Sequence, residues 1–261
     1  MRIPITGLAV ALTVALFLMP GMQAQTDVEH VEHEAGNSAP DVSKAPDLSG
    51  IWMIGGGMDA GRGGRRFNMA EPPFEPWALE KYRAARKGIT DPNEGGLDEL
   101  DPSHFCFPPG AARSMIMPFP FEIVQGPEVV YIPFEFNSGT RRIYLNQKEH
   151  PDDYPVTWMG HSIGRWDGDT LVVDTVSERE ETWLDRVGTP HSDALRMIER
   201  FLRPGRELLE VEFEFQDPKA FTKPWGGTKQ YELQTIGIAE YVQCEEHLEM
   251  GKPREVPQEA P

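Results

Sequence analysis

Positive charge is scarce in this sequence. Lysine and arginine together number 25, against 42 aspartates and glutamates, so the formal net charge is −17. Nucleic acids and anionic membrane surfaces select proteins that carry basic patches. We therefore expect no nucleic-acid partner, and no membrane partner for the mature chain. The acidity does not name a partner, because negative charge often serves only solubility.

Cysteine is almost absent, since Cys106 and Cys244 are the only two. An even pair of cysteines in an oxidising compartment favours a disulfide. A Cys106–Cys244 bond would close most of the domain and stabilise it by about 4–5 kcal/mol in the chain-entropy model. Two buried free thiols are the alternative interpretation.

Long apolar runs are also missing, apart from one at the N-terminus. Residues 1–24 have the pattern of a secretory signal peptide, with Arg2 in a short positive segment, an apolar core from Leu8 to Leu18 and the small residue Ala24. No second run has the length that spans a bilayer. We expect a periplasmic or secreted protein that has no membrane contact once the signal is removed.

The remaining chain divides by composition. Residues 25–46 are polar and rich in Pro, Ser and Glu, which predicts a disordered linker. Residues 47–247 should form a single domain, followed by a disordered tail at 248–261. Residues 55–66 are rich in glycine, but no Gly-Lys-Ser/Thr sequence follows, so they do not form a phosphate-binding Walker loop. We expect no cofactor.

Periodicity predicts an all-β fold with one short helix. The helix, 76–87, begins at Pro76, which suits a first turn, and ends at Lys87-Gly88. Beyond Phe105, short apolar or alternating runs are separated by turn residues, as in an antiparallel meander. About 8–10 such strands close most readily as a lipocalin-like barrel. After a first strand that includes Trp52, the expected strands are 121–125, 129–136, 141–146, 159–166, 170–176, 195–203, 207–215, 228–234 and 238–243.

The stretch from Trp158 to Asp174 holds two competing signals. Gly160-His161-Ser162-Ile163-Gly164 fits the nucleophile elbow of α/β-hydrolases, in which Ser162 would attack the substrate. An elbow needs a helix after the serine. Here Asp167-Gly168 and a β-branched run follow instead, which is the pattern of a β-hairpin. We favour the hairpin.

The register of this hairpin decides which side chains share a face. If Asp167-Gly168 is a two-residue loop, His161 faces Asp174 and Arg165 faces Thr170, with Cβ atoms about 5 Å apart. These four side chains would then form one polar face. A bulge at Gly168 would shift the register by one residue and separate His161 from Asp174. A solvated polar face without function is the alternative.

The loop from Glu181 to Asp193 mixes side chains that are common in catalytic sites. His191 could be held as a general base by Asp185 or Asp193, because a carboxylate fixes the tautomer of the ring. Trp183 adds an aromatic surface to the same loop. In the alternative interpretation, His191 and its neighbours only satisfy backbone groups of the loop.

Five motifs stand out as a set. They are CFPPGAAR from Cys106, WMGHSIGRW from Trp158, WLD from Trp183, PHSDAL from Pro190 and DPKAFTKPW from Asp217. Together they resemble a group of exported bacterial proteins that are usually labelled hypothetical, over roughly residues 47–247. The resemblance implies a shared fold and secretion, and no mechanism. Gly50-Ile51-Trp52 resembles the start of lipocalins, in which the tryptophan plugs one end of the barrel.

These features lead to one main functional hypothesis. A barrel whose mouth binds a small, partly apolar molecule would carry out acid–base chemistry on it, such as hydrolysis, elimination or isomerisation. We expect His161 and His191 within about 10 Å of each other, facing one cavity. The expected catalytic residues are His161, His191, Asp174 and Asp185, and the expected ligand-binding residues are Arg165, Trp158, Trp183 and Asp193.

Three alternatives remain open. The first is a non-catalytic carrier of lipocalin type, which needs only an apolar cavity. The second is a serine hydrolase that acts through Ser162. The third is a divalent metal held by His161, His191 and a carboxylate; because the sequence lacks tight ligand spacing, we predict no metal site.

Overall fold

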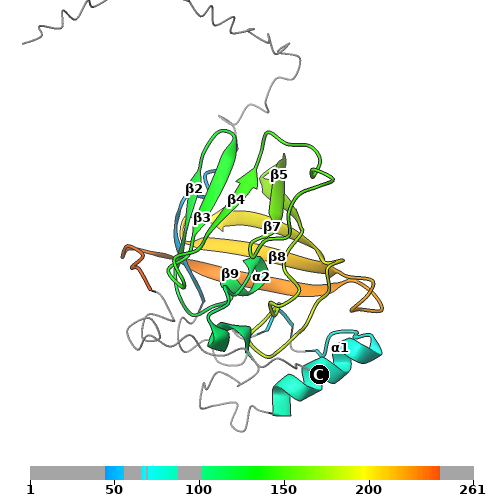
Figure 1. The fold of residues 1–261 in the computed structure, drawn as a ribbon. Coiled ribbons are helices and arrows are strands. Elements are labelled where there is room, and N and C mark those ends of the chain that lie inside the picture. The colour runs from blue at the N-terminus through cyan, green and yellow to red at the C-terminus, as the bar shows by residue number, and fades with distance from the viewer. Residues whose placement is uncertain (1–44, 56–65, 69, 88–100, 242–261) are drawn as a thin grey trace, which may run out of the picture. The chain divides into compact units, whose positions relative to one another are not determined.

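Nine strands close into a barrel in the order in which they occur along the chain (Figure 1). The computed structural model describes residues 45–55, 66–68, 70–87 and 101–241. The predicted signal peptide, most of the linker, Cys244 and the tail lie outside these ranges. The strands are β1 (Gly50–Ile54), β2 (Phe121–Gln125), β3 (Val129–Pro133), β4 (Thr140–Tyr144), β5 (His161–Asp167), β6 (Thr170–Val176), β7 (Arg196–Gly205), β8 (Leu208–Gln216) and β9 (Trp225–Gln234).

The predicted barrel and the predicted helix are both confirmed. Helix α1 is Pro76–Lys87, and a second, four-residue helix, α2 (Ala111–Ser114), follows a 3-10 turn, η4 (Pro102–Phe105). The indole nitrogen of Trp77 attaches α1 to the loop after β8 by donating to the carbonyl of Lys219 at 2.7 Å. Within the ranges that the structure describes, no helix is long and apolar enough to cross a membrane.

Alternating side chains give the barrel its inside and its outside. In β8, Leu209, Val211 and Phe213 are buried, and the glutamates between them point outward. The inward side chains pack against one another. Trp52 of β1 is fully buried, and the ring of Tyr231 on β9 meets Phe121 of β2 edge-on at 5.2 Å between centroids. The interior is therefore a packed core, as in other small barrels.

One junction of the barrel departs from the expected antiparallel meander. Strands β4 and β5 are parallel, and they pair at only two positions, Ile143 with Ser162 and Tyr144 with Ile163. Parallel neighbours need a long connection between them. Residues 145–160 supply it, and within them Lys148 lines a cavity with residues of β5 and β6 while His150 contacts His161 and Asp174. The strand expected at 238–243 is also wrong within the described chain, because Tyr241 forms only an isolated bridge with Phe136.

The β5–β6 hairpin is confirmed, but with a different turn. Ser162 lies in β5 and no helix follows it. The last pair is Asp167 with Thr170, so the loop is Gly168-Asp169 rather than Asp167-Gly168. Gly168 has φ +58° and stands first in the loop, as in a type II′ turn, whereas the expected Asp-Gly loop is of type I′.

This turn changes the register of the hairpin. His161 lies opposite Val176, and Asp174 lies opposite Ile163. The predicted cross-strand pairs His161–Asp174 and Arg165–Thr170 are therefore wrong. Arg165 faces Val172 instead. The dipeptide pattern alone does not decide the glycine's place in the turn. Because Gly168 stands first in the loop, each β5 residue faces a β6 residue two positions further along than expected, and every side chain keeps its predicted face.

Candidate functional site

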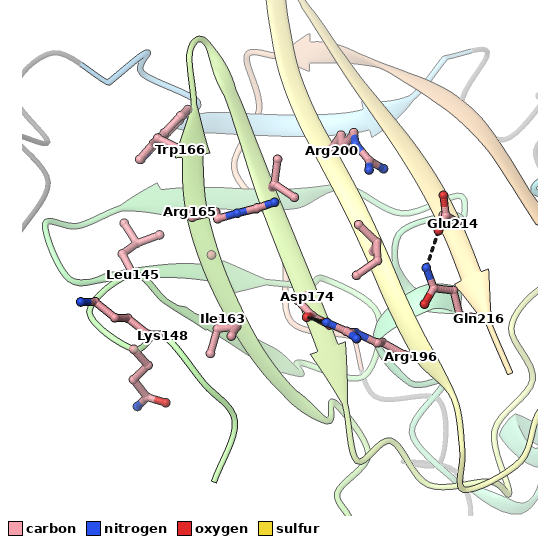
Figure 2. A pocket seen from close by; sticks show the side chains of 14 residues that line it. Leu145, Lys148, Ile163, Arg165, Trp166, Asp174, Arg196, Arg200, Glu214 and Gln216 are labelled. Atoms are coloured by element: carbon pink, nitrogen blue, oxygen red, sulfur yellow. Dashed lines mark hydrogen bonds and ion pairs between the residues drawn. The ribbon is translucent and has the colours of Figure 1, made fainter. Parts of the chain in front are cut away.

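A cavity of about 590 Å³ lies on the outer face of the barrel, over strands β5 to β8 (Figure 2). We call it the outer cleft. Its 14 lining residues are Leu145, Gln147, Lys148, Ile163, Gly164, Arg165, Trp166, Val172, Asp174, Arg196, Ile198, Arg200, Glu214 and Gln216. The crossover that makes β4 and β5 parallel forms one wall, because Leu145, Gln147 and Lys148 belong to it.

The outer cleft has an apolar floor. Ile163, Val172 and Ile198 come from three neighbouring strands and point away from the core, while their neighbours Ser162, Val173 and Met197 point into it. Leu145 continues this surface from the crossover. Together these side chains form an apolar surface on the outside of the barrel.

Cations surround this floor. Arg196 donates to both carboxylate oxygens of Asp174, at 2.9 Å from Nε to Oδ1 and 2.5 Å from Nη2 to Oδ2. Arg200 approaches Glu212 only to 3.8 Å. The side chains of Arg165 and Lys148 form no ion pair or hydrogen bond with any other residue in the described part of the chain. Two positive charges on the rim are thus available to a ligand.

A chain of contacts runs from Asp174 through His150 to the buried His161. His150, in the crossover, has its Nε2 3.6 Å from Oδ1 of Asp174 and its Nδ1 2.7 Å from Nδ1 of His161. His161 is 2% exposed, and the ring of Tyr154 lies 4.3 Å from its own. Burial first, and then the neighbouring His150, lower the pKa of His161. The lowered pKa favours a neutral His161, and the hydrogen between the two Nδ1 atoms belongs to either ring according to their tautomers.

The expected link between His161 and Asp174 thus exists in another form, because His150 stands between them. Sequence reasoning missed His150. It lies in an irregular crossover with no periodicity, and no short motif marks it. Residues 145–150 come to lie against the outer face of the β5–β6 hairpin because β5 runs parallel to β4, which requires a connection that crosses from one end of the strands to the other.

His191 belongs to a separate buried cluster. Its Nδ1 lies 3.1 Å from the carbonyl oxygen of Ser192, which can only accept, so Nδ1 carries the proton. Its Nε2 then accepts from the hydroxyl of Thr182 at 2.7 Å. Burial lowers the pKa of His191. The hydrogen-bond partners of His191 and His161 differ, and neither ring lines the outer cleft.

Asp185 and Asp193 make contacts other than the expected ones to His191. Asp185 accepts from the backbone N–H groups of Val187 and Thr189 and from the Thr189 hydroxyl, so it holds its own loop in shape. Burial raises its pKa. Asp193 is exposed and pairs with Lys219.

The two tryptophans of the predicted site also lie elsewhere. The guanidinium of Arg179 covers Trp158, 4.6 Å from the ring centroid, and that of Arg113 lies 5.6 Å from Trp183. Cation–π contacts of this kind stabilise loops without any ligand. Of the residues predicted to bind or act, Arg165 and Asp174 line the outer cleft, and His161 reaches it through His150.

Glu178 is a buried titratable residue that the sequence did not reveal. It is 3% exposed, its Oε1 accepts from the N–H of Ala111 at 3.2 Å, and the hydroxyl oxygen of Thr182 lies at the same distance from Oε1. Gly110 makes room for it: a Cβ there would lie 2.2 Å from Oε1. Burial raises the pKa of Glu178 to about 8, so the carboxyl is protonated at neutral pH.

A second buried network crosses the inside of the barrel. Arg141 of β4 is 1% exposed and donates to both carboxylate oxygens of Glu199 on β7. It also donates to the hydroxyls of Ser162 and Thr175. Ser162, the nucleophile of the rejected elbow motif, is thus bonded to arginine and threonine rather than to a histidine.

The histidines, cysteines and carboxylates of the described chain do not gather in groups of three or more that could hold a metal ion. In comparisons with known proteins, no family model, no curated protein and no solved structure matches this chain. The function is therefore argued from the site alone.

Proposed function

We propose that this protein binds a small, partly apolar molecule in the outer cleft. The observation that carries the proposal is the apolar floor of Ile163, Val172 and Ile198 inside a cavity of about 590 Å³. Pockets that bind small molecules have this size and this mixture of an apolar base with a few polar groups. The outer face replaces the barrel mouth as the place of binding, because core side chains occupy the interior.

A neutral apolar dye tests this proposal. N-phenyl-1-naphthylamine should fluoresce more strongly on binding, with one site per chain. Ile198→Trp puts a larger side chain on the floor of the cleft and should weaken dye binding at least tenfold. Val124→Trp, on the exposed outer face of β2, is the matched control and should leave binding unchanged. Equal binding to both variants would refute the outer cleft as the site.

Acid–base chemistry in the same cleft is the second candidate. One observation favours it, namely the chain of side-chain contacts that links Asp174 through His150 to His161. Asp174 lines the cleft and would exchange a proton with a bound molecule, while the two imidazoles would supply or store that proton. Native mass spectrometry of the purified protein would first identify the molecule that it carries.

Turnover of that molecule separates an enzyme from a carrier. If the chemistry is real, His150→Ala and Asp174→Asn should abolish turnover and still permit binding. If the molecule is bound but unchanged by the native protein, the protein is a carrier. A fluorophosphonate probe should not label Ser162, because this residue is 1% exposed inside the barrel.

A further inference from the structure

We infer that the ligand of the outer cleft is a monoanionic amphiphile, whose headgroup sits between Arg165 and Arg200 above Val172. This inference rests on the proposed function, since it names the class of molecule that the same site accepts. It follows from the register of three strands and from the charges that line the cleft.

The register places the two arginines on either side of one apolar residue. Arg165 of β5 is paired with Val172 of β6, and Val172 is paired with Arg200 of β7. These three residues form one row across the outer face. Adjacent strands lie about 4.8 Å apart, so the two arginine backbones are about 10 Å apart. Two guanidinium groups can therefore approach one anion from opposite sides.

The next row supplies the apolar part of the site. Ile163 of β5, Asp174 of β6 and Ile198 of β7 are paired in the same way. Asp174 is neutralised by Arg196, which leaves the two isoleucines as the surface that a chain or ring would touch. Leu145 from the crossover extends it. Figure 2 shows Leu145 and Ile163 below Arg165 in this view.

The net charge of the side chains at the cleft indicates a headgroup with one negative charge. Four cations line the cleft, namely Lys148, Arg165, Arg196 and Arg200, against the two carboxylates of Asp174 and Glu214. Glu212 approaches Arg200 from outside the lining and removes one more positive charge. The balance is 4 − 3, or +1. A monoanion neutralises it, whereas a phosphate monoester, with about −1.5 to −2 charges, exceeds it.

The cleft is a local exception on an acidic chain. With a net charge of −17, the whole molecule repels anions at long range. Salt screens that repulsion beyond about 8 Å at physiological ionic strength, so the nearby cations decide what binds. The guanidinium of Arg165 has no ion-pair partner among the described residues, so it meets an anion without first giving up an ion pair.

Titration calorimetry with probes that share an eight-carbon chain tests the inference. Octanoate and octyl sulfate should both bind, octanol should bind more weakly, and octylammonium should not bind. Octyl phosphate should bind more weakly than octyl sulfate. A preference between octanoate and octyl sulfate tells whether the natural headgroup is a carboxylate or a sulfate ester, and either result supports a monoanion.

Arg165→Gln should weaken octanoate binding about fivefold, which corresponds to about 1 kcal/mol for a partly solvated ion pair, and should not alter octanol binding. Arg142→Gln removes an exposed arginine of β4 that does not line the cleft, and it should change neither. If octanol and octylammonium bind as well as octanoate, the anionic class is wrong and the apolar cleft stands. If no probe or dye binds and Ile198→Trp has no effect, the proposed function itself fails.

Discussion

At the scale of single residues, burial raises the pKa of Glu178, and no sequence pattern around this residue predicts the shift. The carboxyl has a pKa of about 8 in the folded chain, against 4.5 in water. Between these two values the folded state binds more protons than the unfolded state. The contribution of Glu178 to the free energy of unfolding is therefore complete below about pH 4.5. It declines by up to about 1.4 kcal/mol per pH unit as the pH rises, and is lost once the pH passes about 8.

Glu178→Gln should remove this dependence. The amide keeps the shape of the side chain but has no proton to lose. Urea unfolding between about pH 6.5 and 7.5 is the measurement, because unperturbed histidines in the unfolded chain titrate at or below this range. Glu181→Gln, an exposed neighbour, is the control and should retain the slope of the native protein. Equal slopes in both variants would show that Glu178 is ionised when folded.

Side-chain roles were harder to predict than residue types. His161, Arg165 and Asp174 were identified correctly as residues of one hairpin, but their cross-strand pairs depend on whether Gly168 stands first or second in its turn. Asp185 and His191 lie close in sequence and have different partners, because the folding of a long loop is set by tertiary packing. His150 and Glu178 carry no local signal at all.

At the scale of elements, Arg141 is the interior link between strands. It joins β4 to Ser162 on β5, Thr175 on β6 and Glu199 on β7. The link crosses one of the two shortest ladders of the barrel: β4 and β5 share two pairs, as do β2 and β3, while β7 and β8 share eight. The network thus stabilises closure where the backbone ladder is short.

Removing only one partner of this network should be costly. Arg141→Met leaves the Glu199 carboxylate buried without its counterion and should lower the free energy of unfolding by about 3–5 kcal/mol. Arg141→Met with Glu199→Met should lower it less, because no uncompensated charge remains. Urea unfolding of both variants is the measurement. A double variant less stable than the single one would contradict this explanation.

The elements themselves could largely be predicted from the sequence. Helix α1 and strand β6 have the predicted bounds, because Pro76, Lys87-Gly88 and the run from Thr170 to Val176 are strong local signals. The parallel β4–β5 junction could not be predicted, since alternation gives the faces of a strand but not its direction relative to a neighbour. Nor does Arg141-Arg142 indicate which arginine points inward.

At the scale of the whole molecule, the pairing of Cys106 with Cys244 stays a prediction, because Cys244 lies outside the described residues. Thiol titration of the exported protein, denatured but not reduced, should find no free thiol. After reduction it should find two per chain. Two free thiols before reduction would contradict the disulfide. The expected stabilisation of about 4–5 kcal/mol can then be checked by comparing urea unfolding with and without reductant.

The alternation of inward and outward side chains has a consequence for how this protein can change over time. On β6 and β7 the cleft uses Val172 and Arg200, while the core uses Leu171, Val173 and Phe201 beside them in the chain. Positions that line the cleft and positions that form the core therefore alternate along the same strands. Mutations at the outward positions can alter what is bound and leave the barrel intact, so a new ligand can be acquired by drift or by laboratory selection without a new scaffold.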